Sequence, residues 1–135
     1  MRLIRENPNY ICYVKSKKFG PYYLPVRYQY LIQRDYLSKI NKKFSLPQGE
    51  AVFSKTSIRL RTIIDSMQKN DVLILISLFM LPEDYEIRTR LLKNVIKKKI
   101  KIHCIFENIV AVNKNKILEL HKRILLYKKI NNTKT

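Results

Sequence analysis

The chain has 135 residues, and its 28 lysines and arginines against 10 aspartates and glutamates give a formal net charge of +18. A chain of this length has room for one hydrophobic core and not for two. No apolar stretch approaches the roughly 20 residues that a membrane-spanning helix needs. The N-terminal sequence also lacks the apolar core of a signal peptide. We therefore expect one cytoplasmic domain without a membrane anchor.

The first half of the chain predicts two strands and two helices. Residues 10–14 are a short β-branched and aromatic run that is typical of a strand. A proline can open the helix expected over 25–43, and after a Leu-Pro-Gln-Gly turn residues 51–53 form a candidate edge strand. Thr56 or Ser57 is the expected N-cap of the next helix.

The second half predicts a strand, a helix, another strand and a last helix. The continuous apolar run 72–76 is typical of a strand buried on both faces of a parallel sheet. Pro82 stands where a helix can begin, with acidic residues in the first turn and lysines in the last. The alternation over 100–106 predicts a second strand, and a strand–helix–strand unit of this length makes the two strands parallel. The last helix is expected over 113–130.

The alternation of strands and helices predicts an α/β fold. We expect one doubly wound domain of three layers around a mostly parallel central sheet of four to five strands. The sequence divides into an α/β domain over residues 1–112 and a C-terminal basic helix and tail over 113–135.

The residues that could hold a metal or a cofactor are scattered. Cys12 and Cys104 both fall in predicted buried strands, so we expect two reduced thiols in preference to a disulfide or a metal pair. His103 and His121 are isolated, and the sequence has no glycine-rich phosphate loop. We therefore expect no metal, no cofactor and no small-molecule ligand.

Three short segments carry a resemblance to a known family. Residues 13–17 are Tyr-Val-Lys-Ser-Lys, residues 78–83 are Leu-Phe-Met-Leu-Pro-Glu, and residues 107–109 are Glu-Asn-Ile. Their order and spacing resemble the catalytic domain of the serine recombinases, the resolvase and DNA-invertase family. That family has Tyr-x-Arg-x-Ser and Leu-Asp-Arg-Leu-Gly-Arg at the first two places. The resemblance covers about residues 10–109 and implies a resolvase-like fold, although no single motif is intact.

The departures from the family's motifs imply that the chemistry has been lost. In the family a serine attacks a DNA phosphodiester, and arginines stabilise the charge of the pentavalent transition state. Lys15 and Lys17 stand at the positions of the first arginine and of the nucleophile. Removing one oxyanion donor typically costs ~10²–10³ in rate, so we expect no enzyme activity. The residues that replace the family's acid and three further arginines are Phe79, Met80, Glu83 and Ser57.

Ser16 is the one candidate for retained catalysis. It lies one residue from the nucleophile position, and a shift in the register of the loop would place it there. Arg59 and Arg61 would then replace the missing arginine of the following helix. Its side chain should however point to the opposite face, and Met80 and Glu83 would still oppose a phosphate. The simpler interpretation of Ser16 is an ordinary loop hydroxyl.

The last predicted helix combines an apolar stripe with many basic residues. In the family the corresponding helix forms the dimer interface, and its distal part lies along DNA before a separate helix-turn-helix module. We expect no such module in this protein. By resemblance, an apolar set would pair two copies of the chain: Ile117, Leu120, Ile124 and Tyr127. A basic set would contact DNA phosphates: Lys17, Lys18, Lys114, Lys116, Lys122, Arg123, Lys128 and Lys129. The alternative is a terminal helix that only covers one side of the sheet.

Charge and resemblance together lead to hypotheses of different classes. We favour a catalytically inactive, recombinase-like protein that associates with DNA as a monomer or dimer, because a strongly positive field attracts phosphates. It would act in regulation or in DNA organisation. The alternative is a protein-interaction module that reuses the dimer surface to bind a regulator or a true recombinase. A minor alternative is an active site-specific recombinase that uses Ser16.

Overall fold

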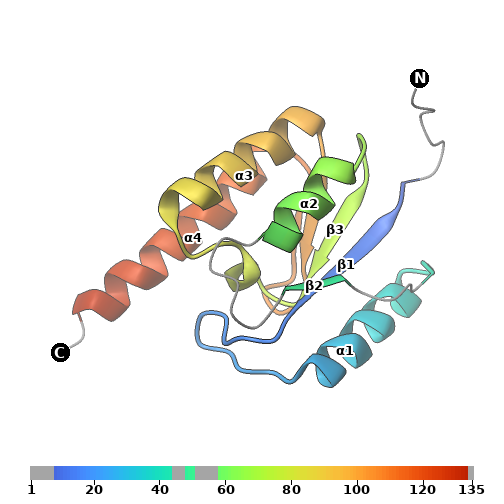
Figure 1. The fold of residues 1–135 in the computed structure, drawn as a ribbon, viewed down its shortest axis with the longest axis horizontal. Helices are drawn as coiled ribbons and strands as arrows, with labels where there is room; N and C mark the ends of the chain where they lie inside the picture. The colour runs from blue at the N-terminus through green and yellow to red at the C-terminus, as the bar shows by residue number, and fades with distance from the viewer. Residues whose placement is uncertain (1–7, 44–47, 51–57, 134–135) are drawn as a thin grey trace.

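Five strands form one sheet in a computed structural model that describes residues 8–43, 48–50 and 58–133 (Figure 1). The strands are β1 (Tyr10–Lys15), β2 (Gln48–Glu50), β3 (Val72–Leu75), β4 (Lys101–Cys104) and β5 (Ile109–Ala111). Their order in the sheet is β2-β1-β3-β4-β5, and β4 and β5 are the antiparallel pair. The prediction of a mostly parallel sheet is confirmed.

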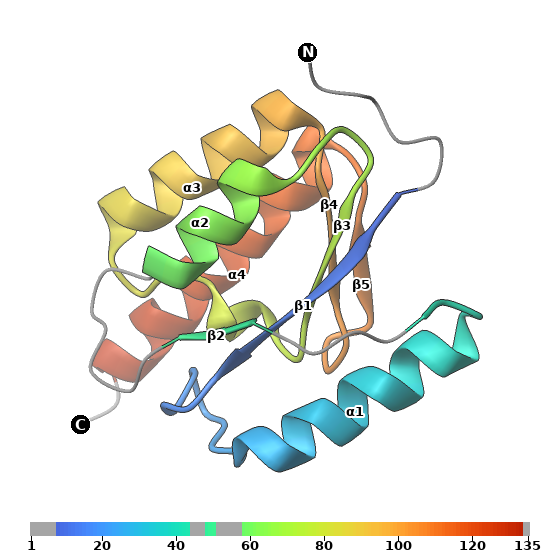
Figure 2. The same cartoon turned by 45° about the vertical axis from the view of Figure 1, so that its right-hand side comes forward.

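Helices cover both faces of this sheet and make it the middle of three layers. The α-helices are α1 (Val26–Lys39), α2 (Ile58–Ser66), α3 (Tyr85–Lys98) and α4 (Lys114–Thr133). Figure 2 shows α1 alone on one face, with α2, α3 and α4 side by side on the other. The α/β class and the C-terminal helix are as predicted.

The strand residues divide between the two faces by simple alternation. Cys12 and Ile74 lie in a small cluster with Leu37 of α1. Tyr13 and Leu75, one residue further along each strand, lie in the larger cluster that α2, α3 and α4 complete. The central strands are thus buried on both faces, which explains why their sequence is continuously apolar.

Two buried glutamines attach α1 to the end of β1. The Gln29 amide donates to the Lys15 carbonyl at 2.7 Å, and the Gln29 carbonyl oxygen accepts the Lys15 N–H at 3.0 Å. Gln33 donates to the Tyr13 carbonyl at 2.8 Å. Both amides are fully buried, so their hydrogen bonds fix where the chain leaves β1 and where α1 begins.

The helix expected to open at Pro82 begins three residues later. Asp84 is the N-cap of α3, because its carboxylate accepts the Ile87 N–H at 2.9 Å. Between β3 and α3 the chain instead forms a 3₁₀ turn, η1 (Leu78–Met80), followed by a buried Pro82. The prediction that Pro82 is the first helical residue is therefore wrong.

Other boundaries differ by a few residues. The first helix ends at Lys39 and does not reach residue 43. The short strand β2 occupies residues that the sequence predicted as part of a turn. The predicted edge strand 51–53 and the predicted caps Thr56 and Ser57 lie outside the described residues.

The strand predicted over 100–106 stops at Cys104, and the chain turns back into β5. Asn108 adopts a left-handed conformation with φ 54°, which lets the chain reverse within a short loop. The returning strand β5 pairs Val110 with His103 and is the edge strand of the sheet beside β4. A strand of three residues is too short to leave a periodic pattern in the sequence.

Candidate functional site

The two segments that resemble catalytic motifs meet at one edge of the sheet. Because β1 and β3 are parallel neighbours, the residues that follow them lie at the same carboxyl edge. The loop after β1 lies directly against the turn after β3. A Cβ atom placed on Gly20 would be 2.4 Å from Cγ of Phe79, and Gly20 has φ +57°. Only glycine fits this approach without strain.

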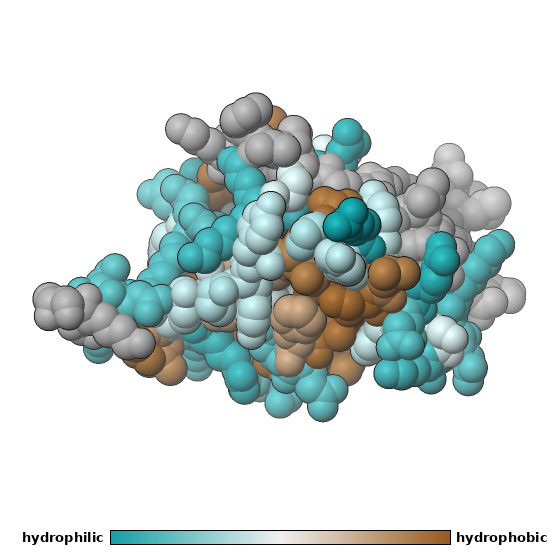
Figure 3. All heavy atoms as spheres, turned by 90° about the horizontal axis from the view of Figure 1, so that it is seen from below, coloured by the Kyte–Doolittle hydropathy of each residue, from teal (hydrophilic) through white to brown (hydrophobic). Residues whose placement is uncertain are grey.

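Aromatic rings fill the space between these segments. Phe79 lies 6.3 Å from Tyr22 and 4.7 Å from Tyr127, measured between ring centroids. Tyr22 in turn lies 6.1 Å from Phe19 and 5.0 Å from Phe106. We call these five residues the aromatic cluster. In Figure 3, which views the carboxyl edge, an apolar area lies between hydrophilic surfaces.

Glu107 holds the turn that carries Phe79. Its carboxylate accepts the Ser77 hydroxyl at 2.6 Å and the Leu78 N–H at 2.8 Å. The Ser77 hydroxyl oxygen also accepts the Phe79 N–H at 3.2 Å, which caps the 3₁₀ turn. The Glu-Asn-Ile segment therefore contributes a structural carboxylate to this edge.

The remaining positions that the resemblance singles out differ widely in exposure. Met80 is fully buried in the core, whereas Glu83 is exposed. Lys15 is buried at the end of β1. The Ser16 hydroxyl is buried and has no hydrogen-bond partner within the described part of the chain. Ser57 lies outside it.

Arg88 is fully buried beneath the same turn, a feature that the sequence did not reveal. Its Nη1 donates to the carbonyls of Pro82 at 2.9 Å and Glu83 at 3.0 Å, and its Nε donates to Nδ1 of His121 at 3.0 Å. Lys128 of α4 also donates to the Glu83 carbonyl. The end of the turn is thus fixed by α3 and α4 together.

The position of Arg88 has electrostatic consequences. Burial lowers the pKa of the guanidinium, with Tyr85 and Asp84 acting in the opposite direction. Burial and the neighbouring Arg88 charge also lower the pKa of His121. Helical spacing offered one signal, because Arg88 lies three residues before Leu91 on the inward face. Arginines are however rarely fully buried, so the spacing alone did not predict the burial of Arg88.

The apolar stripe of α4 is used within the chain. Ile117, Leu120 and Ile124 are 2%, 0% and 3% exposed, and they belong to the core cluster under the sheet. Tyr127 packs on Phe79 in the aromatic cluster. The predicted dimer contact through these residues needs correction, because in this structure they cover the sheet. The exposed apolar residues of α4 lie further along: Leu125, Leu126 and Ile130.

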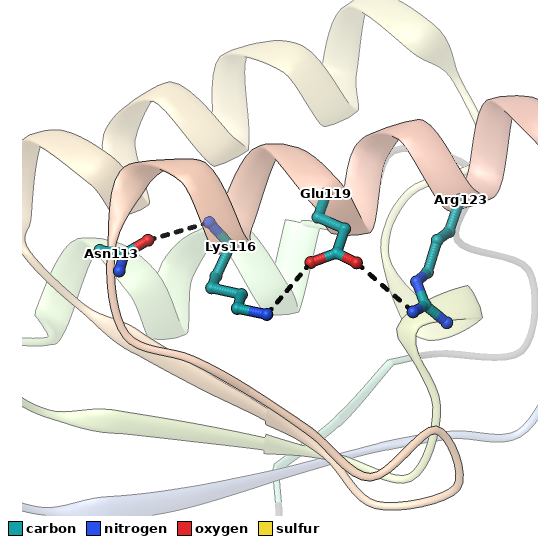
Figure 4. A network of polar contacts seen from close by, with 4 residues as sticks. All are labelled: Asn113, Lys116, Glu119 and Arg123. Atoms are coloured by element: carbon teal, nitrogen blue, oxygen red, sulfur yellow. Dashed lines mark hydrogen bonds and ion pairs between the residues drawn. The ribbon is translucent and has the colours of Figure 1, made fainter.

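Two of the predicted DNA-binding residues of α4 share one carboxylate. Lys116 and Arg123 lie 3.6 and 3.4 Å from the oxygens of Glu119 (Figure 4). Asn113 caps the helix by accepting the Lys116 N–H at 3.0 Å. The Glu119 charge offsets part of the positive charge on this face.

The other predicted DNA-binding residues are spread over different parts of the surface. Lys122 and Lys129 are exposed and lie two helical turns apart, on one side of α4. Lys114 stands at the opposite end of the helix, at the amino edge of the sheet. Lys18 is exposed and Lys17 half-buried in the loop after β1. The predicted set therefore does not form one continuous face of α4.

His103 and the two thiols are structural. His103 Nδ1 lies 2.6 Å from the Tyr36 hydroxyl, and burial, together with Lys101, lowers its pKa. Cys12 and Cys104 are buried and free, as predicted. Burial raises the pKa of the Cys12 thiol to about 12 and also raises that of Cys104.

A metal cluster and a membrane-spanning helix are both absent from the part of the chain that the structure describes. Within residues 8–43, 48–50 and 58–133, no three His, Cys, Asp or Glu side chains gather as a metal site requires. No helix in the same part of the chain has both the length and the apolar character to span a membrane. Comparisons with protein-family models, with curated proteins and with solved structures found no match.

Proposed function

We propose that this protein is a catalytically inactive relative of the serine recombinases that associates with DNA through its backbone charge. Its role would be regulatory or architectural, and its resolvase-like identity and cytoplasmic location are parts of the same proposal. The observation that carries it is the aromatic cluster at the carboxyl edge. Phe79 lies there between Tyr22 and Tyr127, where the family's chemistry needs an acid and arginines.

The loss of catalysis is supported by the surroundings of each family position. A serine nucleophile needs a base within hydrogen-bond reach, and a phosphoryl transition state needs donors aimed at its oxygens. The Ser16 hydroxyl has no partner among the described residues, and Met80 is enclosed in the core. Glu83, the residue in place of a phosphate-binding arginine, would repel a phosphate.

DNA association is supported by the net charge of +18 and by exposed lysines in the loop after β1 and on α4. Lys18 lies in the loop that packs on Phe79, and Lys122 and Lys129 are exposed on the side of α4 that faces away from Tyr127. Each phosphate that a lysine neutralises releases condensed counterions, so binding gains free energy at low salt without reading the sequence. The buried free thiols suit a reducing compartment.

A salt titration of DNA binding tests this proposal. Fluorescence anisotropy with two duplexes of equal length and unrelated sequence should give nearly equal affinities at each salt concentration. The logarithm of the binding constant should fall with slope of about −0.9 for each phosphate contact. The Lys122→Gln/Lys129→Gln variant should reduce the magnitude of that slope by about 2. Absence of binding to either duplex at low salt would rule the proposal out.

The exposed apolar residues of α4 favour a second candidate, a protein-interaction module. Leu125, Leu126 and Ile130 are 38%, 58% and 47% exposed near the C-terminal end of the helix. A partner, either a regulator, a true recombinase or a second copy, would cover these side chains and not the buried Ile117 stripe. Light scattering at rising protein concentration measures self-association, and Leu126→Ser/Ile130→Ser should abolish it. This candidate would be favoured if the purified protein has no DNA affinity and still captures a protein partner after the sample is treated with nuclease.

A further inference from the structure

A hollow of about 370 Å³ lies at the amino edge of the sheet, between the end of α3 and the start of α4. Its walls come from the residues that precede β3 and β4 and from those that follow β5. The aromatic cluster lies at the carboxyl edge, at the other end of the strands. The volume falls within the range of roughly 300–1,000 Å³ that is usual for small-molecule sites.

Three lysines line this hollow: Lys99, Lys101 and Lys114. No carboxylate is among the lining residues. The nearest acid in sequence, Asp71, is 1% exposed and accepts the N–H groups of Asn9 and Gln68. Concave surfaces that carry charge of one sign concentrate the field, so this hollow should attract anions.

The backbone at each lysine is fixed by hydrogen bonds. Lys99 ends α3 in a left-handed conformation, with its N–H donating to the Ile96 carbonyl at 3.2 Å. The Lys101 N–H donates to the Asp71 carbonyl at 2.9 Å, which ties the first residue of β4 to the chain before β3. Lys114 is the first residue of α4, directly after the Asn113 cap. The backbones of three lysines are thus fixed around one hollow by three different elements.

The floor of the hollow is apolar. Ile96, Ile100, Val112 and Ile117 contribute to its lining. Half-buried Ile96 and exposed Val112 offer most of the apolar surface, and the almost completely buried Ile100 and Ile117 lie behind them. A hydrated inorganic ion gains nothing from such a floor, whereas an apolar ring or chain does. The combination of an apolar floor with a few convergent charged groups is typical of a site for an amphipathic ligand.

We infer that this hollow binds a small organic anion. A phosphate or carboxylate group would contact Lys99, Lys101 and Lys114, and an apolar ring or chain would lie on the isoleucines. This inference does not rest on the proposed DNA association. Lys114 belongs to the basic set predicted to contact DNA, but Lys122 and Lys129, the lysines that the salt titration changes, are not among the lining residues. It also revises the sequence-based expectation that the protein has no small-molecule ligand.

The first test uses 8-anilinonaphthalene-1-sulfonate, a fluorescent anion with an apolar ring system. It should bind the purified full chain saturably and at one site. Loss of a charged contact typically weakens binding about tenfold, so Lys99→Gln/Lys114→Gln should raise the dissociation constant by at least that factor. Lys122→Gln/Lys129→Gln removes the same charge from the exposed side of α4 and should leave the constant unchanged. Equal weakening in both variants would overturn the inference, because it would indicate binding to net charge alone.

The second test keeps the charge and fills the space. Val112 lines the hollow and is 50% exposed, so Val112→Phe should fold and should abolish probe binding. Amide chemical-shift changes on adding the probe should be confined to residues around the hollow. Displacement by adenosine monophosphate or by decanoate distinguishes a phosphate ligand from a carboxylate one. Shift changes centred on Phe106 and Tyr22, or unaltered binding by Val112→Phe, would place the probe elsewhere and contradict the inference.

Discussion

The two edges of the sheet differ in what surrounds their charges. At the carboxyl edge, where parallel α/β sheets usually place their ligands, aromatic rings occupy the space between the two loops. At the amino edge, three lysines surround an open hollow with an apolar floor. A cation-rich chain can bind an anion only where the fold leaves space beside the cations. Phe79 fills this space at the carboxyl edge, whereas at the amino edge the hollow stays open between the end of α3 and the start of α4.

The largest effect should come from disturbing the contact that closes the carboxyl edge. Gly20→Ala adds a methyl group 2.4 Å from Phe79 at a residue with φ +57°. Left-handed strain and overpacking together should lower the free energy of unfolding by about 3 kcal/mol, measured by urea denaturation. In the double variant Gly20→Ala/Phe79→Ala, the penalty should be smaller than the sum of the two single penalties, since the contacts with the ring are removed and only the 2.8 Å approach to Cβ at position 79 remains. Additive penalties would show that the loop does not rest on Phe79.

Removal of the carboxylate that holds the turn should have the next largest effect. Glu107→Ala leaves the Ser77 hydroxyl and the Leu78 N–H without their acceptor. The expected loss of stability is about 2 kcal/mol, and Glu107→Gln should lose less because its amide oxygen still accepts. Equal stability of the alanine variant and the wild type would show that the turn holds its shape without Glu107.

The stability of the fold should fall as the pH is lowered below about 6.5, the ordinary pKa of histidine. Burial lowers the pKa of His103 and His121, so the unfolded chain binds protons before the folded chain does. Stability is therefore full above the unfolded pKa and decreases as the pH falls towards the lowered folded value. His121→Gln keeps an acceptor for Arg88 and should reduce the drop in melting temperature between neutral and mildly acidic pH. A drop of unchanged size would mean that other groups cause it.

The smallest effect should come from the exposed ion pairs of α4. Glu119→Gln removes the carboxylate shared by Lys116 and Arg123, whose side chains are 57% and 50% exposed. Exposed pairs contribute little, so stability should change by less than about 0.5 kcal/mol. DNA affinity at low salt should rise, because two cations are released and one negative charge is lost. Weaker DNA binding would indicate that the network positions Lys116 or Arg123 for the contact.

Local patterns predicted much of the fold, and contacts between distant residues explain the rest. The apolar run of β3 and the stripe of α3 were sufficient to predict a strand–helix–strand unit. The start of α3 was misplaced because Pro82 alone served as the start signal, whereas the Asp84 carboxylate caps the helix and sets its boundary. Sequence spacing alone could not show which side chains would meet across the fold.

The candidate sites were harder to predict from the sequence than the fold, because residues far apart in the chain form them. Motif spacing predicted which residues would replace the catalytic ones, but not that Phe79 would pack on Tyr127. Arg88 and His121 are 33 residues apart in the chain, and Ser77 and Glu107 are 30 apart. The hollow at the amino edge is formed by the ends of separate elements, so no single segment of the sequence indicates it.

The most direct test of DNA association without chemistry is one incubation with DNA that is divided between two gels. The protein is mixed with a labelled duplex at low salt and resolved in parallel on a native gel and on a denaturing gel. We predict a shifted complex on the native gel that is lost as salt is raised, and only free protein and free DNA on the denaturing gel. A covalent protein–DNA band that disappears in Ser16→Ala, or no shift at any salt concentration, would contradict the account.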